Sequence, residues 1–407
     1  QEKILSDMGL PLDNVLAKME MAGIKVSGGV LSEIGLENEK VIADLTAEIY
    51  ELAGETFNIN SPKQLGVILF EKMQLPVIKK TKTGYSTAVD VLEQLAPQAP
   101  IVDKILKFRQ ISKIQSTYVT GLLGEIMADG KIHTRYIQDL TQTGRLSSVQ
   151  PNLQNIPVRL AEGRKIRKAF LPEKSESVLL SSDYSQIELR VLAHISEDEH
   201  LIAAFNDGAD IHTATAMRVF GIEKPEDVTP NDRRNAKAVN FGVVYGISDF
   251  GLSNNLGITR KAAKTYIDTY FERYPDIKKY MEDIVRSAKD KGYVETLYHR
   301  RRNLPEINAR NFSVRSFAER TAINSPIQGS AADILKVAMI NLDRALAAGG
   351  YQAKMLLQVH DEIVLDVPHD ELDAIKALVK TTMEEAIDLK VPLLVDENSG
   401  KTWYEAK

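Results

Sequence analysis

Cysteine is absent from the 407 residues, which excludes disulfide bonds and thiolate metal sites and fits an intracellular protein. No stretch of 18 or more apolar residues occurs, so no membrane partner is expected. The first ten residues lack the basic and apolar segments of a signal peptide. They also lack an initiator methionine, which favours a processed or truncated chain. With 43% hydrophobic and 26% charged residues, the chain has a globular composition and a length typical of two or three domains.

An excess of positive charge is also lacking, because 51 Lys and Arg stand against 56 Asp and Glu, for a formal net charge of −5. This balance argues at first against a nucleic-acid partner. The charge is unevenly distributed, however: residues 141–170 contain six basic residues and one acid, and residues 286–320 contain nine and four. Electrostatic steering depends on where the charge lies, so these segments are consistent with a basic groove. Solvated basic loops are the alternative.

Helical patterns dominate the chain, and three short apolar segments predict strands. Residues 28–130 read as helical, with a helix that starts at Ser61 and a basic turn at 79–84. Residues 178–183 predict a buried strand, and two further strands flank His360 and Asp361 as a hairpin. We therefore expect a helix-rich α+β fold with a small sheet whose strands are far apart in the sequence.

Two acidic residues stand at the ends of these predicted strands, Asp183 after the first and Asp361 in the hairpin turn. His-Asp is a poor turn pair compared with Asn-Gly, so turn formation alone does not explain an acid there. If the strands pair, the two carboxylates come together, and hard oxygen ligands with open positions suit Mg²⁺. A solvated hairpin tip is the alternative. Residues 185–188 also spell a helix-capping box, so Glu188 has a purely structural interpretation as well.

A second set of residues lies on one face of a predicted helix. Arg233, Lys237, Phe241 and Tyr245 recur at every fourth position and span roughly 120° of the helix surface. Two cations followed by two aromatic rings suit a triphosphate and a sugar or base. We expect Gly246 to end the helix. An amphipathic helix with aromatic core residues is the alternative.

Six strings, taken in order, resemble the motifs of family A DNA polymerases, the DNA polymerase I type. DYSQIELR (183–190) is similar to motif A, RRNAKAVNFGVVYG (233–246) to motif B and QVHDE (358–362) to motif C. The other similar strings are TGRLSS (143–148) with PNLQNIP (151–157), DIHTATA (210–216) and INSPIQGSAADI (323–334). The resemblance covers nearly the whole chain.

The resemblance implies a right-hand polymerase architecture: a palm with a small antiparallel sheet, helical fingers and a helical thumb. The implied segments are an N-terminal palm-associated segment (1–27), the thumb (28–130), the first part of the palm (131–195), the fingers (196–319) and the second part of the palm (320–407). No proofreading 3′–5′ exonuclease is expected in the chain.

The implied reaction is two-metal-ion nucleotidyl transfer from a dNTP to a primer 3′ end, with release of pyrophosphate, in DNA replication and repair. Asp183 and Asp361 would bind two Mg²⁺ ions, with Mn²⁺ able to substitute, and the Tyr184 backbone carbonyl would be a further ligand. Glu362 would support this metal site. Lys237 would protonate the leaving group.

The residues implied to bind the incoming nucleotide are Arg233, Lys237, His212, Phe241, Tyr245, Gln186 and Glu188. The cations and the histidine would contact the triphosphate, Phe241 the sugar, and Tyr245 the template base. Glu188 would fill the space that a ribose 2′-hydroxyl needs, and so select deoxynucleotides.

The residues implied to contact primer–template DNA are Arg145, Asn152, Gln154, Arg320, Asn324, Gln328 and His360. Hydrogen-bond donors in the minor groove meet purine N3 and pyrimidine O2, which are acceptors at every correct pair, so binding is independent of sequence yet sensitive to mismatches. The expected protein is a monomer that binds primer–template DNA and dNTP in the cytoplasm, associated with the nucleoid if bacterial.

Three rival interpretations remain. A single-subunit RNA polymerase uses similar motifs, but Glu188 and TGRLSS favour DNA synthesis. A catalytically dead DNA-binding module would lack metal ligands, whereas Asp183, Asp361 and Lys237 are all present. An unrelated helical scaffold requires all the motif matches to be accidental.

Overall fold

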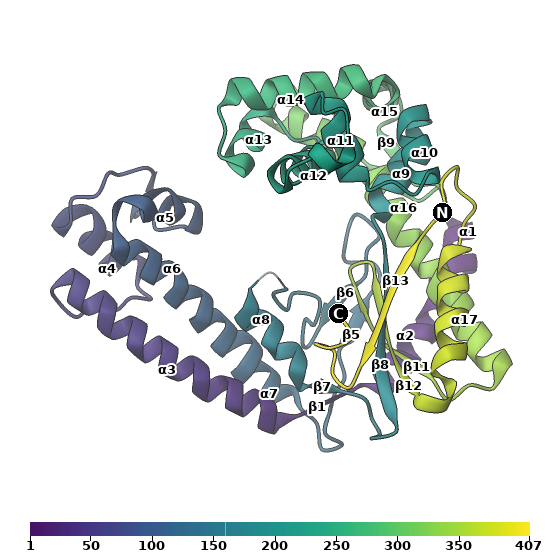
Figure 1. The fold of residues 1–407 in the computed structure, drawn as a ribbon, viewed down its shortest axis with the longest axis horizontal. Helices are drawn as coiled ribbons and strands as arrows, with labels where there is room; N and C mark the ends of the chain where they lie inside the picture. Colours follow the sequence, from purple (N-terminus) through teal and green to yellow (C-terminus); the bar gives the residue numbers. More distant parts are fainter. Residues whose placement is uncertain (159) are drawn as a thin grey trace. The chain divides into compact units, whose positions relative to one another are not determined.

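The computed structural model describes residues 1–158 and 160–407, which form two compact units (Figure 1). The larger unit consists of residues 1–22, 135–154 and 174–399, and the smaller unit of residues 23–134, 155–173 and 400–407. Each unit is assembled from segments that are distant in the sequence. The five-part division into thumb, palm and fingers stays a prediction. In the described part of the chain, no helix combines the length and apolar character needed to cross a membrane.

The smaller unit is mainly helical, and its long helix α3 packs against α6 around a core that includes Leu45, Ile49 and Ile105. The predicted helix start at Ser61 is confirmed, because the Ser61 hydroxyl accepts a hydrogen bond from the Gln64 N–H at 3.3 Å. Its elements are β1 (Ile24–Val26), α3 (Gly28–Ala53), α4 (Pro62–Gly66), β2 (Lys80–Thr81), β3 (Gly84–Tyr85), α5 (Val89–Leu95), α6 (Pro100–Lys113), α7 (Gly121–Glu125), β4 (Lys131–Ile132), α8 (Ala161–Lys165) and β7 (Phe170–Leu171).

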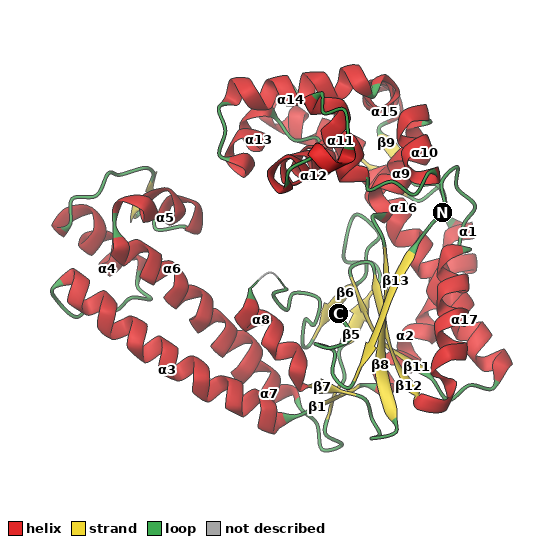
Figure 2. Cartoon of the chain, in the orientation of Figure 1, coloured by secondary structure: helices red, strands yellow, loops and turns green. Residues whose placement is uncertain are grey.

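The larger unit contains most of the strands and a helical region between them. Its elements are α1 (Glu2–Ile4), α2 (Leu10–Ala22), β5 (Arg135–Ile137), β6 (Ser147–Val149), β8 (Ser177–Tyr184), α9 (Ile187–Ser196), α10 (Glu199–Asn206), α11 (Ile211–Phe220), α12 (Pro230–Val244), α13 (Asp249–Leu256), α14 (Arg260–Arg273), α15 (Pro275–Lys291), β9 (Tyr293–Glu295), β10 (Arg301–Asn303), α16 (Phe312–Gly349), β11 (Lys354–Val359), β12 (Glu362–Pro368), α17 (Leu372–Glu384) and β13 (Val395–Gly400). Helices prevail over strands throughout the chain (Figure 2), which confirms the predicted helix-rich α+β class.

A four-stranded sheet in the order β11-β12-β8-β13 forms the centre of the larger unit. The predicted hairpin is present as the antiparallel pair β11 and β12, and β12 pairs antiparallel with β8, as the sequence predicts. The first six residues of β8 are all buried, and they include three serines as well as the apolar segment Val178–Leu180. Helix α17 packs against β8 and β12, and the Tyr184 hydroxyl donates to the Met383 carbonyl at 2.6 Å.

Local sequence signals fix both ends of helix α12. Thr229 and Asp232 form a capping box, and Pro230 occupies the first helical position. Tyr245 is the last residue before Gly246, whose φ of 63° is readily adopted by glycine. The predicted helix and its predicted end are both confirmed.

Candidate active site

The pairing of β8 with β12 brings the two predicted metal ligands side by side. Asp183 lies opposite Glu362 in the register, and the Tyr184 N–H donates to the carbonyl oxygen of Asp361 at 3.2 Å. The side chains of both aspartates are half-buried, in contrast to the buried strand residues before and after them. The two aspartates, 178 residues apart in the sequence (183 to 361), therefore lie at the same end of two neighbouring inner strands.

Glu362 has a different environment from the two aspartates. It is 1% exposed, and its Oε1 accepts a hydrogen bond from the Ser181 hydroxyl at 2.6 Å. Ser181 lies on the same strand as Asp183, two residues earlier, so this bond ties β12 to β8 beside the aspartate pair. A supporting position for Glu362 agrees with this contact, although its role in the reaction stays a prediction.

The donor set fits a hard divalent cation that is completed by other ligands. Across residues 1–158 and 160–407, no group of three His, Cys, Asp or Glu side chains is arranged to hold a metal ion. Two half-buried carboxylates instead leave several coordination positions for water and for substrate phosphate oxygens, which is how Mg²⁺ is usually bound. The site therefore fits a metal that arrives with its substrate.

Two glutamine side chains hold the turn at His360 and Asp361: Gln154, which was predicted to contact DNA, and Gln358, to which no role was assigned from the sequence. His360 has a φ of 55°, which a residue other than glycine adopts at some cost. The Gln358 side chain donates to the His360 carbonyl, and Gln154 Nε2 donates to Gln358 Oε1 at 3.0 Å. Gln358 is 4% exposed within a strand of apolar residues, and that polar interruption in QVHDE was the available signal.

Glu188 is not a helix cap, so the capping-box interpretation of residues 185–188 is wrong. Helix α9 begins at Ile187 after Gln186, whose φ is 54°, and no side chain caps it. The Glu188 carboxylate instead accepts from Arg145 Nη2 at 2.7 Å and from the Tyr245 hydroxyl at 2.9 Å. Residues from three separate motifs therefore meet at one carboxylate.

The electrostatics of this cluster keep Tyr245 protonated. Burial, the Glu188 charge and their hydrogen bond together raise the pKa of the Tyr245 hydroxyl to about 12. The Asp361 charge raises this pKa further, while Arg145 lowers it, so all four residues share one electrostatic environment. At neutral pH the phenol is consequently a hydrogen-bond donor to Glu188.

Helix α12 presents its first predicted cation, Arg233, next to an acid that the sequence analysis did not assign. Asp210 accepts from Arg233 Nε at 3.2 Å and from Nη2 at 2.7 Å, and it also caps helix α11 through the Thr213 N–H at 2.8 Å. Burial raises the pKa of Asp210, but the bonds from Arg233 and Thr213 outweigh it and lower the pKa to about 2. The first residue of DIHTATA was its only sequence signal.

His212 and Phe241 lie against each other between helices α11 and α12. Their ring centroids are 5.7 Å apart, and His212 Nδ1 is 3.1 Å from Asn240 Nδ2. Burial lowers the pKa of His212 to about 4; the Asp210 charge opposes this, and Lys237 and Arg233 add to it. Lys237 is exposed one turn before Phe241. The α12 stripe, by which we mean the helix face with Arg233, Lys237, Phe241 and Tyr245, thus has cations near its start and aromatic rings near its end.

The remaining predicted DNA contacts lie on two elements. Asn152 is exposed and accepts from the Gln154 N–H at 2.9 Å in the loop after β6. On α16, Asn324 Nδ2 lies 3.5 Å from the Val244 carbonyl, Arg320 donates to the Ser316 hydroxyl at 2.9 Å, and Gln328 is half-buried. Their contacts with DNA stay a prediction.

Comparison with known proteins agrees with this geometry. Residues 29–405 match the model of DNA polymerase family A, and the chain belongs to that family. It is 78% identical over 407 residues to DNA polymerase I of Lactococcus lactis and 58% identical over 408 residues to DNA polymerase I of Geobacillus stearothermophilus. Each match covers 100% of this chain and 46% of the relative, so the chain spans a little under half the length of these proteins.

A solved structure is also similar over almost the whole chain. The POL domain of Pol1 from M. smegmatis, in complex with DNA primer-template and dNTP, matches with a TM-score of 0.95 and 44% sequence identity. The match covers 99% of this chain and 71% of that one. Family membership excludes the unrelated helical scaffold and implies the use of divalent metal ions, which the Asp183 and Asp361 donor set fits.

Proposed function

We propose that this chain is a template-directed DNA polymerase, which adds dNTPs to a primer 3′ end and releases pyrophosphate. The observation that supports this most is the β8–β12 pairing, which joins Asp183 to the turn at Asp361. The family match and the M. smegmatis complex with primer-template and dNTP support the same substrates. We further propose that the chain acts as a monomer in the cytoplasm, in replication and repair.

The proposed metal ligands are Asp183, Asp361 and the Tyr184 backbone carbonyl, and the proposed metal is Mg²⁺, with Mn²⁺ able to substitute. When bound, two such ions would activate the primer hydroxyl and stabilise the charge on the pyrophosphate. Glu362 holds the ends of strands β8 and β12 together through its hydrogen bond with Ser181. Arg233 and Lys237 supply positive charge for the triphosphate, and Lys237 gives a proton to the leaving group.

The neutral His212 imidazole offers the triphosphate a hydrogen bond without adding charge. Phe241 packs against His212 and contacts the sugar of the nucleotide. Gln186 lies at the turn that leads to Glu188. Glu188 occupies the space of a 2′-hydroxyl because Arg145 and Tyr245 hold its carboxylate on both oxygens. Arg145, Asn152, Gln154, Arg320, Asn324, Gln328 and His360 are the proposed contacts with primer–template DNA.

Primer extension on a defined template tests this function. The wild type with Mg²⁺ and dNTPs is expected to extend the primer, and Asp361→Asn to lose at least about 10³-fold in rate, because a metal ligand becomes neutral. Asp370→Asn is the matched control, since Asp370 is an exposed acid that follows β12. Equal extension by wild type and Asp361→Asn would refute the proposal.

The same assay separates the two rival functions. Faster extension with NTPs than with dNTPs would identify an RNA polymerase, and tight primer–template binding without extension in Mg²⁺ or Mn²⁺ would identify a catalytically dead binding module. A chelator should abolish extension and leave the folded state intact, because the proposed metal ions arrive with the substrate.

A further inference from the structure

The hairpin of β9 and β10 holds the TGRLSS loop against helix α16. Arg302 donates to Gln142 Oε1 and to Ser325 Oγ, both at 3.0 Å, and so connects the start of the loop to the helix. Arg300, from the same hairpin, packs against Gly144: a Cβ at that glycine would lie 2.9 Å from Arg300 Cδ. Two arginines of one hairpin therefore contact the loop at two points.

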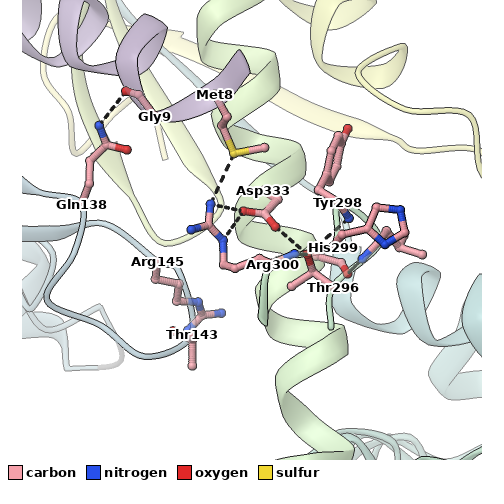
Figure 3. A network of polar contacts seen from close by, with 12 residues as sticks. Met8, Gly9, Gln138, Thr143, Arg145, Thr296, Tyr298, His299, Arg300 and Asp333 are labelled. Atoms are coloured by element: carbon pink, nitrogen blue, oxygen red, sulfur yellow. Dashed lines mark hydrogen bonds and ion pairs between the residues drawn. The ribbon is translucent and has the colours of Figure 1, made fainter. Parts of the chain in front are cut away.

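A buried acid fixes the position of Arg300. Asp333 on α16 is fully buried, and its Oδ1 is 2.8 Å from both Nε and Nη2 of Arg300. The other carboxylate oxygen of Asp333 accepts a hydrogen bond from the Thr296 hydroxyl at 2.8 Å (Figure 3). The same hydroxyl accepts a hydrogen bond from the Arg300 N–H at 3.1 Å. Both oxygens of the acid are thus used to set the backbone and the guanidinium of one arginine.

The loop that Arg300 contacts leads directly to Arg145. Gly144 has a φ of 81°, and its N–H donates to the Thr141 carbonyl at 3.3 Å, while the Thr141 hydroxyl donates to the Arg145 carbonyl at 2.6 Å. The loop also approaches α16 closely, because a Cβ at Gly329 would lie 3.1 Å from the Thr143 carbonyl oxygen. The backbone at Arg145 is therefore determined by contacts of the residues just before it.

We propose that Arg300, anchored by Asp333, is a positioning residue that aims the Arg145 guanidinium at Glu188. Arg300 packs against the loop at Gly144, where the left-handed backbone conformation turns the chain toward the Glu188 carboxylate. This inference rests on the proposed function, in which Glu188 and Arg145 meet the sugar and the primer–template. Loss of Arg300 should lower kcat/KM for dNTP on the order of 10-fold, the usual scale for groups that orient a site residue.

A double-mutant cycle tests whether Arg300 acts through Arg145. The variants are Arg300→Leu, Arg145→Ala and the pair together, with single-nucleotide extension measured for dNTP and NTP. We expect both single variants to lose kcat/KM and dNTP preference, and the double variant to be within about twofold of Arg145→Ala alone, because coupled residues are not additive. Arg300→Lys should recover part of the loss. Multiplicative losses, or full activity in Arg300→Leu, would overturn the proposal.

Arg301→Gln is the matched control, because the exposed Arg301 lies in the same hairpin and its guanidinium Nε contacts the half-buried Glu295 at 2.8 Å. Hydrogen exchange at the Gly144 amide provides a second readout that needs no activity. Exchange should quicken at least about fivefold in Arg300→Leu and stay as in the wild type in Arg301→Gln. Unchanged exchange at Gly144 in Arg300→Leu would overturn the proposed role of Arg300, whatever the activity of the wild type. Failure of the wild type to extend primers would refute the proposed function and would leave the exchange result to be judged separately. If Arg300→Leu does not fold, Asp333→Asn takes its place in the cycle.

Discussion

The Tyr245 hydroxyl donates a 2.9 Å hydrogen bond to Glu188 Oε2, joining the end of helix α12 to the start of helix α9. The other carboxylate oxygen is taken by Arg145, so Glu188 is held from two sides. A carboxylate fixed in this way has little freedom to move aside for an extra substrate atom. In the proposed function, the shape of Glu188 as well as its charge would therefore discriminate between sugars.

Glu188→Ala should relax the discrimination between sugars. Removing the fixed carboxylate opens space for a 2′-hydroxyl, so the kcat/KM ratio of NTP to dNTP should rise by about 10²-fold, the usual scale for a clash with one small group. Single-nucleotide extension with matched dNTP and NTP measures the ratio, with the exposed Glu199→Ala as control. An unchanged ratio would remove Glu188 from its proposed role.

Phe241→Tyr should increase chain termination by dideoxynucleotides. A tyrosine hydroxyl adds a polar group beside the sugar, where a nucleotide without its 3′-hydroxyl has none, so discrimination should fall by at least about 10-fold. Competition between a dNTP and its dideoxy counterpart in primer extension measures the effect. If termination did not increase, the contact between Phe241 and the sugar would be wrong.

Acid should destabilise the wild type through His212. Its pKa is lowered to about 4, mainly by burial, so the folded state disfavours the proton that the unfolded chain accepts near pH 6.5. The wild type should therefore lose stability relative to His212→Gln as the pH falls from about 6.5 to 4, by at most about 3 kcal/mol. Denaturant unfolding at several pH values measures this difference, and a constant difference would contradict the assignment.

Alkali should have the opposite effect through Lys336, which is 2% exposed on helix α16. Burial and then the Arg300 charge lower its pKa to about 8, against the effect of Asp333. The folded state thus resists carrying this charge, and Lys336→Met should stabilise the chain at neutral pH by about 1–3 kcal/mol. The gain should shrink as the pH rises from about 8 to 10.5. A gain that did not depend on pH would point to packing alone.

The sequence predicted the elements whose residues repeat in a simple pattern. The β8–β12 pairing, the two-residue turn at His360 and the C-terminal end of helix α12 were predicted from apolar runs and from Gly246, and all are present. Periodicity specifies one element at a time, so it reveals which residues share a face of that element. The α12 stripe could therefore be predicted from residue spacing alone.

Contacts between elements were not predictable in the same way. Glu188 looked like a helix cap because its neighbours in the sequence fit that pattern, whereas its partners lie 43 and 57 positions away. Asp210 and Gln358 were overlooked for the same reason, since their importance comes from Arg233 and Gln154 across a gap in the sequence. Side-chain networks depend on tertiary packing, which no local pattern specifies.

Strand β8 lies between β12 and β13, and both neighbours are made long after it. The register partner of Asp183 is Glu362, which leaves the ribosome 179 residues later (183 to 362). Because synthesis proceeds at about 5–20 residues per second, roughly 10–40 s pass before the first residue that pairs with β8 is made. During that time the six successive buried residues of β8 have no strand to pair with. During synthesis the intervening helices or a chaperone must cover that strand. The pair of aspartates can therefore form only after the residues between positions 183 and 361 have been synthesised.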